Sequence, residues 1–213
     1  MPFLHITTRI EGHPYDNLLR EKGGRGFPTL QFMDADGNTL AVQSERTVAG
    51  FERTLAELTR LLDLEKRVAA GEKGLENGLF LARFRLGRIS YAEAREQAGR
   101  LKDLTAEQKR ELAALLLDGE VQEIISGAGR DPEKIAAAGR RLKELLAEGR
   151  MPSEKIRPMM WSFLLRYADQ EGDADLYARA LAWYQEQYGD EPRAESFLKR
   201  LQERLKELRA AGS

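Results

Sequence analysis

The chain has 213 residues, a formal net charge of −1 at neutral pH, and 32% charged residues of both signs. This balance gives no electrostatic basis for binding nucleic acid or an anionic membrane surface. The sequence contains no cysteine, which excludes disulfides, thiolate catalysis and cysteine-ligated zinc. No apolar run approaches the ~18–20 residues that span a bilayer, and the first residues lack the layout of a signal peptide, so we expect a cytoplasmic protein.

The first residues predict a strand and then a short helix. Residues 3–10 are rich in apolar and β-branched side chains, and residues 15–22 have the spacing of a helix. The two histidines, His5 and His13, lie in the strand and in the turn after it. No carboxylate or cysteine pattern accompanies them, so we predict no metal site here.

A β-hairpin is predicted next. Pro28 has no N–H to donate and suits the first residue of a strand, and the residues after it alternate between apolar and polar. Asp36 and Gly37 supply the backbone conformation of a tight turn, so the flanking strands should be antiparallel. Asp34, Asp36 and Asn38 alternate as the first ligands of a calcium loop do, but we interpret them as part of the hairpin turn.

Three segments give this region a family resemblance. In chain order they are Gly26-Phe27-Pro28-Thr29, the strand and acidic turn from Phe32 to Asn38, and Phe51-Glu52-Arg53-Thr54-Leu55. Roughly, residues 2–60 resemble the C-terminal half of a thioredoxin-like domain, in which a cis-proline precedes a strand, a turn, a second strand and a closing helix. The resemblance implies a cis Phe27–Pro28 bond and a loop for substrate or peptide binding formed by Phe27, Pro28 and Thr29.

The same resemblance sets an expectation for the sheet. In thioredoxin-like domains the strand leading into the Cys-x-x-Cys motif lies between the strand matching residues 3–10 and the strand after the cis-proline. This chain has no such motif. We expect residues 3–10 to pair directly with the strand after Pro28, which completes a sheet of about three antiparallel strands. Two alternatives remain open, namely a strand-exchanged homodimer and a strand supplied by another polypeptide.

From residue 47 onward the sequence predicts helices. Thr47 can cap a first helix whose apolar stripe comprises Phe51, Leu55, Leu58, Leu62 and Leu64. Capping-box patterns begin at Ser90 and Thr105, and Asp131 before a proline marks another start. Glycines mark most of the ends. The later helices are predicted at residues 75–86, 91–102, 106–126, 132–148, 153–171, 174–188 and 192–210, with short connections that favour antiparallel neighbours.

One helical turn resembles that of a tetratricopeptide repeat. Leu86-Gly87 ends a helix there, and Tyr91-Ala92 opens the next. A fainter match follows Gly172, but its separation from Gly87 is not a multiple of the family's ~34-residue period. We therefore predict repeat-like helical packing, not a repeat array.

The fold class is predicted to be α+β. Residues 1–65 would form the partial thioredoxin-like domain, and residues 66–213 an all-helical, tetratricopeptide-like domain of antiparallel helices.

Both tryptophans and most of the tyrosines fall in the last third of the chain. Such a cluster either forms the core between two packed helices or lines a groove for a partner helix or peptide. The candidate partner-binding residues are Trp161, Tyr167, Trp183 and Tyr184.

Two functions remain after these observations. The leading hypothesis is a non-catalytic protein-interaction module built on a thioredoxin-like remnant, with a protein or peptide partner and no cofactor. The alternative is a fragment of a thiol-disulfide or selenol oxidoreductase whose active-site motif lies upstream of Met1. As written, the chain is expected to lack disulfide-exchange activity and to be a monomer or a strand-exchanged homodimer.

Overall fold

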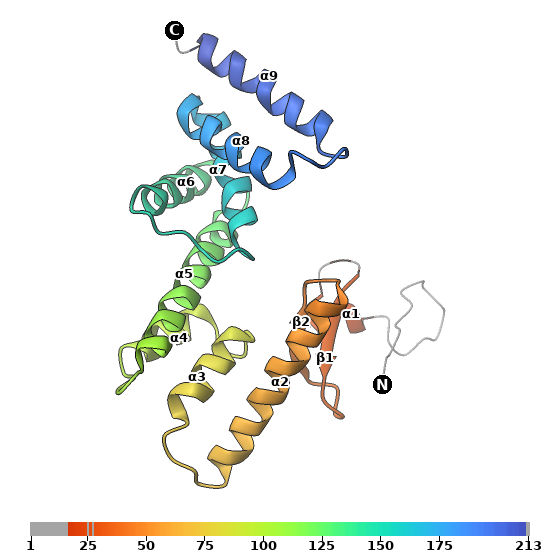
Figure 1. Ribbon diagram of the computed structural model, residues 1–213, viewed down its shortest axis with the longest axis vertical. Coiled ribbons are helices and arrows are strands. Elements are labelled where there is room, and N and C mark those ends of the chain that lie inside the picture. Colours follow the sequence, from red (N-terminus) through yellow and green to blue (C-terminus); the bar gives the residue numbers. More distant parts are fainter. Residues whose placement is uncertain (1–16, 25, 27, 212–213) are drawn as a thin grey trace, which may run out of the picture. The chain divides into compact units, whose positions relative to one another are not determined.

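The structure, a computed structural model, describes residues 17–24, 26 and 28–211. The chain divides into two compact units. The first unit comprises Met1–Ala94 and Arg100–Leu104, and the second comprises Arg95–Gly99 and Thr105–Ser213 (Figure 1). The predicted boundary after residue 65 falls inside a continuous helix, Val48–Ala69, and the two domains stay a prediction.

A two-stranded antiparallel hairpin begins the first unit within the described residues. Strand β1 (Leu30–Met33) pairs with β2 (Thr39–Gln43), and the register shifts by one residue after Phe32. The turn forms because Asp34 Oδ1 accepts hydrogen bonds from the backbone amides of Asp36 (3.0 Å) and Asn38 (2.8 Å). The hairpin is thus confirmed. The third strand predicted at residues 3–10 lies outside the described residues.

Each face of the hairpin contacts a different helix. On one face Phe32 lies against Phe51 of α2 (Val48–Ala69), with ring centroids 6.1 Å apart. On the other face the Gln31 amide donates to Lys22 O (2.7 Å), just after the short helix α1 (Leu18–Glu21). Lys22 Nζ in turn donates to Gly37 O in the turn (2.5 Å). These contacts fix the hairpin between α1 and α2 (Figure 1).

Helix α2 has two different partners along its length. Thr47 Oγ1 accepts from the Gly50 amide and caps its start, as predicted. Beyond the hairpin, α2 packs on α3 (Glu76–Arg85) through a small core of Leu61, Leu64, Leu79 and Ala82. The stripe expected from the sequence is only partly correct. Leu58 and Leu64 are buried, but Phe51, Leu55 and Leu62 are exposed, while Leu61 joins the buried face.

The remaining helices have the predicted caps. Ser90 and Thr105 form their capping boxes with Glu93 and Gln108, and the Asp131 carboxylate accepts from the first amides after it. The helices are α4 (Tyr91–Ala98), which spans the division between the units, α5 (Ala106–Ala128), α6 (Pro132–Ala147), α7 (Arg157–Glu171), α8 (Ala174–Tyr188) and α9 (Glu195–Ala211). The largest differences from the predicted bounds are at α4, which stops four residues early, at α7, which starts at Arg157 and not at residue 153, and at α9, which starts at Glu195 and not at residue 192.

The second unit has one continuous hydrophobic core. Consecutive helices from α5 to α9 pack on each other, and Leu142, Leu145, Met160 and Leu164 are fully buried between them. The Tyr167 ring of α7 lies so close to Gly139 of α6 that a Cβ at Gly139 would overlap it. The glycine therefore sets how closely these two helices approach. The fold is mostly helical with a small antiparallel sheet, which agrees with the α+β class.

Candidate functional site

The loop candidate from the thioredoxin resemblance is only partly visible. Phe27, and with it the predicted cis bond before Pro28, lies outside the described residues. Pro28 is exposed, and Thr29 Oγ1 donates to Gly26 O (2.7 Å). Thr29 thus tightens the entrance to β1, and peptide binding by this loop stays a prediction.

The acidic turn of the hairpin is occupied by its own hydrogen bonds. The Asp34 carboxylate accepts two backbone amides, and Asn38 Nδ2 donates to its second oxygen at 2.9 Å. The hydrogen bonds from Asn38 lower the Asp34 pKa. Glu45 stands eleven residues after Asp34, where a calcium loop has its glutamate. Here, however, Glu45 accepts from Thr47 Oγ1 and pairs with Arg53.

In residues 17–24, 26 and 28–211, the acidic side chains do not gather into a metal site, and His5 and His13 lie outside these residues. Over the same residues, no helix combines the length and apolarity that crossing a bilayer requires.

The aromatic residues of the second unit form a connected cluster. Trp161 of α7 stacks on Trp183 of α8, with centroids 6.2 Å apart and planes 19° apart. Trp183 makes edge contacts with Tyr184 (5.0 Å) and Tyr188 (6.1 Å). Phe197 of α9 adds an edge contact with Tyr184 at 5.4 Å. We call these five residues the aromatic cluster. It joins α7, α8 and α9.

Burial divides the aromatic cluster into a base and an outer layer. Trp161 is only 6% exposed, whereas Trp183, Tyr184, Tyr188 and Phe197 are half-buried. A surface of half-exposed aromatic rings over a buried one is typical of binding hot spots, where Trp and Tyr are enriched. The cluster therefore lies partly in the core and partly at the surface, and partner binding there stays a prediction.

Two buried donors in α7 have no acceptor within the described part of the chain. They are Trp161 Nε1 and Arg157 Nε, which lie four residues apart and so on the same face of the helix. The Arg157 guanidinium makes one long hydrogen bond, from Nη2 to Pro152 O at 3.3 Å. Buried N–H groups normally have hydrogen-bond partners, so these two are exceptions among the described residues, as is the buried Oε1 of Gln43 in the first unit.

The tyrosine beside Trp183 keeps its proton over the physiological range. Burial raises the pKa of Tyr184, a hydrogen bond with Ser162 lowers it, and neighbouring Tyr188 raises it. The phenol therefore remains neutral and can donate or accept a hydrogen bond at the edge of the aromatic cluster.

Of the four predicted partner-binding residues, three come together and one does not. Trp161, Trp183 and Tyr184 are in the aromatic cluster, but Tyr167 faces α6. Six residues separate Tyr167 from Trp161, which turns a helix through about 240° and places them on different faces. Tyr167 is a core residue, 6% exposed.

Sequence reasoning missed Arg157, Ser162 and Phe197. The four-residue spacing of Arg157 and Trp161 was a usable signal, since it places both side chains on one helix face. Phe197 gave no such signal, because only the packing of α9 on α8 brings it to Tyr184.

No family model, no curated protein and no solved structure matches this chain. The likenesses to thioredoxin-like domains and to tetratricopeptide repeats therefore rest on the quoted residues alone.

Proposed function

We propose that the chain is a protein-interaction module that binds a peptide or helix segment of its partner over the aromatic cluster of α7, α8 and α9. The observation that carries this proposal is the buried, acceptor-free indole N–H of Trp161 beneath the half-exposed ring of Trp183. Trp183 stacks on Trp161, so only the Trp183 ring separates a partner that contacts it from the Trp161 ring.

Energetics favour a ligand that brings an acceptor. A buried polar group without a hydrogen bond costs about 1–3 kcal/mol, and this cost is offset when a partner supplies the missing oxygen. Arg157 Nε, one turn before Trp161, presents a second such donor. A carboxylate or a backbone carbonyl can accept from both, because N–H donors of this kind bind either oxygen.

The outer layer suits an apolar side chain next to that oxygen. Trp183, Tyr184 and Tyr188 make edge and tilted contacts with each other, which leaves parts of their faces and edges at the surface. Aromatic rings held in this way offer large contact areas at a small cost in conformational entropy. The partner segment is therefore expected to combine leucine or phenylalanine with glutamate or aspartate.

Tryptophan fluorescence gives a direct test, since both tryptophans of the chain lie in the aromatic cluster. The probe is a panel of short synthetic peptides that combine leucine or phenylalanine with glutamate, titrated into the full chain. We expect some of them to change the emission, and Trp183→Ala to weaken their binding about tenfold or more. Val42→Ala, in β2, is the control and should leave binding unchanged.

Two results would contradict the proposal. One is a panel in which no peptide changes the emission. The other is a set of peptides that bind Trp183→Ala as tightly as the unaltered chain.

The second candidate function is the oxidoreductase fragment. Its support is the order α1, Pro28, β1, acidic turn, β2, α2, with α1 and α2 on opposite faces of the hairpin. Genomic DNA upstream of the codon for Met1, read in frame through UGA, tests it. A Cys-x-x-Cys or selenocysteine codon there would favour this function, and its absence would remove the main reason for it.

A further inference from the structure

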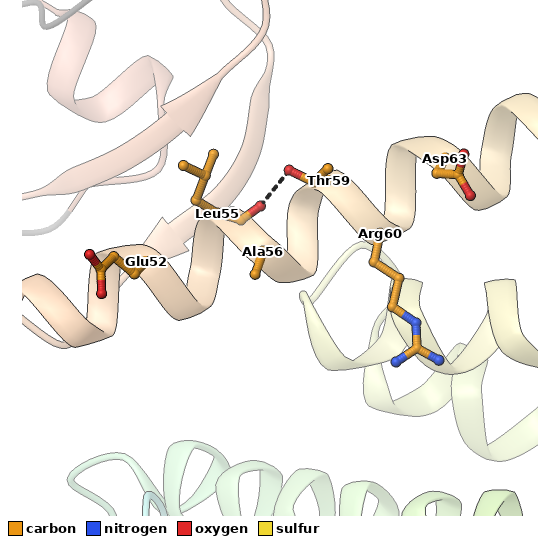
Figure 2. A pocket seen from close by; sticks show the side chains of 6 residues that line it. All are labelled: Glu52, Leu55, Ala56, Thr59, Arg60 and Asp63. Carbon is orange, nitrogen blue, oxygen red and sulfur yellow. Dashed lines mark hydrogen bonds between the residues drawn. The ribbon is translucent and has the colours of Figure 1, made fainter.

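Helix α2 carries an exposed face that no other described residue of the first unit covers. Its central part is a shallow depression of about 580 Å³ (Figure 2). All of the residues that line it belong to α2 and are exposed, namely Glu52, Leu55, Ala56, Thr59, Arg60 and Asp63. We call this surface, together with Val48 and Leu62, the outer face of α2.

The large apolar residues of the outer face repeat every seven positions. Val48 is 76% exposed, Leu55 55% and Leu62 47%, all in one continuous helix. Apolar residues at seven-residue spacing form a narrow stripe along one face of a helix, at one of the two apolar positions per heptad that a coiled-coil seam uses. The buried contacts of α2 use different residues, chiefly Leu58, Leu61 and Leu64. The stripe is therefore not part of the unit's own core.

We propose that the outer face of α2 binds the same face of a second copy of this chain, with the two helices antiparallel and the two-fold axis at Leu55. In this arrangement Leu55 meets Leu55 of the second copy, and Val48 meets Leu62 of the second copy on both sides of the axis. The stripe is symmetric about its centre, so all three of its residues are covered at once. A self-complementary patch of this kind is what a two-fold interface requires.

Charge selects the antiparallel direction. With the two-fold axis at Leu55, Glu52 of one copy lies level with residue 58 of the second copy. Arg60 of the second copy is two residues further, which is about 3 Å along the helix at a rise of about 1.5 Å per residue. Two symmetric ion pairs can form there. A parallel pair in register would instead place Glu52 beside Glu52 and Asp63 beside Asp63, and like charges at such positions destabilise the contact.

The helix ends favour the same direction. Asp63 comes to lie level with Thr47 and Val48 of the second copy, at the start of α2. The first turn of α2 contains no acidic residue of its own. A carboxylate near a helix N-terminus is stabilising, so Asp63 of each copy adds to Glu45, which stands just before the helix and pairs with Arg53. Small Ala56 and Thr59 beside Leu55 allow the two helices to approach (Figure 2).

This dimer differs from the strand-exchanged dimer that the sequence left open. It uses helix α2 alone and leaves both edges of the hairpin unchanged. It is also independent of ligand binding at the aromatic cluster.

Single cysteines give a decisive test, because the natural chain has none. The full-length variants are Leu55→Cys, Val48→Cys, Leu62→Cys and, as a control of similar exposure on the hairpin, Val42→Cys. Under mild oxidation we expect Leu55→Cys to form a covalent dimer. A mixture of Val48→Cys and Leu62→Cys should cross-link to each other, and each should cross-link several-fold less when alone.

Sedimentation over a range of concentrations completes the test. Leu55→Glu should raise the dimer dissociation constant about tenfold or more, whereas Val42→Glu should leave it unchanged. Glu52→Arg and Arg60→Glu should each weaken the dimer, and the double variant should restore it.

Three outcomes would overturn the proposal. The first is a monomer at all concentrations with no cross-link above that of Val42→Cys. The second is efficient cross-linking of Val48→Cys alone, which would mean a parallel pair. The third is a dimer that Leu55→Glu does not affect, since its interface would then lie elsewhere, in an exchanged strand or another surface.

Discussion

The two units of this chain differ in how far their large apolar side chains are exposed. Within the described residues, nearly all of the exposed large apolar side chains belong to the first unit, and the second unit has one, Met159. Those of the first unit are Met33, Val42, Val48, Phe51, Leu55 and Leu62. The second unit instead buries a continuous core from α5 to α9. Among the described residues, the second unit also has two buried donors without an acceptor, on Arg157 and Trp161, and the first unit has one buried oxygen without a donor, Gln43 Oε1.

This difference predicts two kinds of partner. A surface with exposed apolar residues gains most from another apolar surface, which is the basis for the proposed pairing of α2 with itself. A buried donor gains most from an acceptor, which is the basis for the proposed peptide site at the aromatic cluster. If the comparison is right, matched substitutions in the two units must have unequal effects.

The largest expected difference is between two leucines. Leu164 is fully buried in the core of the second unit, so Leu164→Ala should lower the free energy of unfolding by about 2–5 kcal/mol. Leu55→Ala, at a position 55% exposed, should change it by no more than about 0.5 kcal/mol when measured on the dilute monomer. Urea denaturation gives both values. Equal costs would show that Leu55 is part of a core within its own chain.

Two glycines in helix interiors give the next largest effect, with opposite signs. Gly139→Ala places a Cβ into the ring of Tyr167 and should destabilise the chain by about 1–3 kcal/mol. Gly78→Ala in α3 meets nothing within 4 Å and should stabilise by about 0.5–1 kcal/mol, because alanine is the better helix former. The matched pair separates packing from helix propensity. A neutral or stabilising Gly139→Ala would mean that α6 and α7 can move apart freely.

Local signals made the helices predictable. A capping box or an N-cap aspartate needs only residues within one turn, so Ser90, Thr105 and Asp131 marked helix starts that the structure contains. The hairpin turn was equally local, since Asp34 bonds to residues two and four positions away. Where the start depended on a distant contact, the prediction failed. Ser153 donates to Asp118 in α5, and α7 begins only at Arg157.

The faces of α2 and the composition of the aromatic cluster were less predictable. Helix α2 has leucines on two sides, so the three- and four-residue spacing from Leu55 to Leu64 fits either a buried or an exposed stripe. Only the packing of α3 and the hairpin decides that Leu58 and Leu61 are inside. Phe197 joins the cluster through the contact of α9 with α8, which no local pattern encodes.

The third prediction concerns pH and the start of α8. The Asp173 carboxylate accepts from the Leu176 amide (3.0 Å) and from Lys143 of α6 (2.5 Å). Burial raises the pKa of Asp173, but the hydrogen bond from Lys143 and those from the backbone outweigh it, so the net pKa is lowered from 3.8. Its contribution to stability is therefore fully present above about pH 4 and is lost as the pH falls through the lower folded-state pKa.

Asp173→Asn keeps a good cap and removes the charge. It should cost about 0.5–1 kcal/mol at pH 7, a modest value because Lys143 is half-exposed, and the difference from the unaltered chain should shrink below pH 4. Asp131→Asn, at the cap of α6, controls for helix capping. Denaturation curves at a series of pH values measure both. A difference that stays constant down to low pH would contradict the role given to the Lys143–Asp173 pair.

A small net effect on stability is expected at Trp161, whose indole N–H carries the proposed binding. Trp161→Phe removes buried apolar area, which is destabilising, and also removes a buried N–H without an acceptor, which is stabilising by about 1–3 kcal/mol. The two contributions nearly cancel, so the free energy of unfolding should change by less than about 1 kcal/mol. Phe163→Leu, in the same helix, also shortens a buried aromatic residue but removes no polar group, and it should cost more. If Trp161→Phe costs several kcal/mol, the indole N–H already has an acceptor in the folded chain, and the second unit would then have no missing partner at that position.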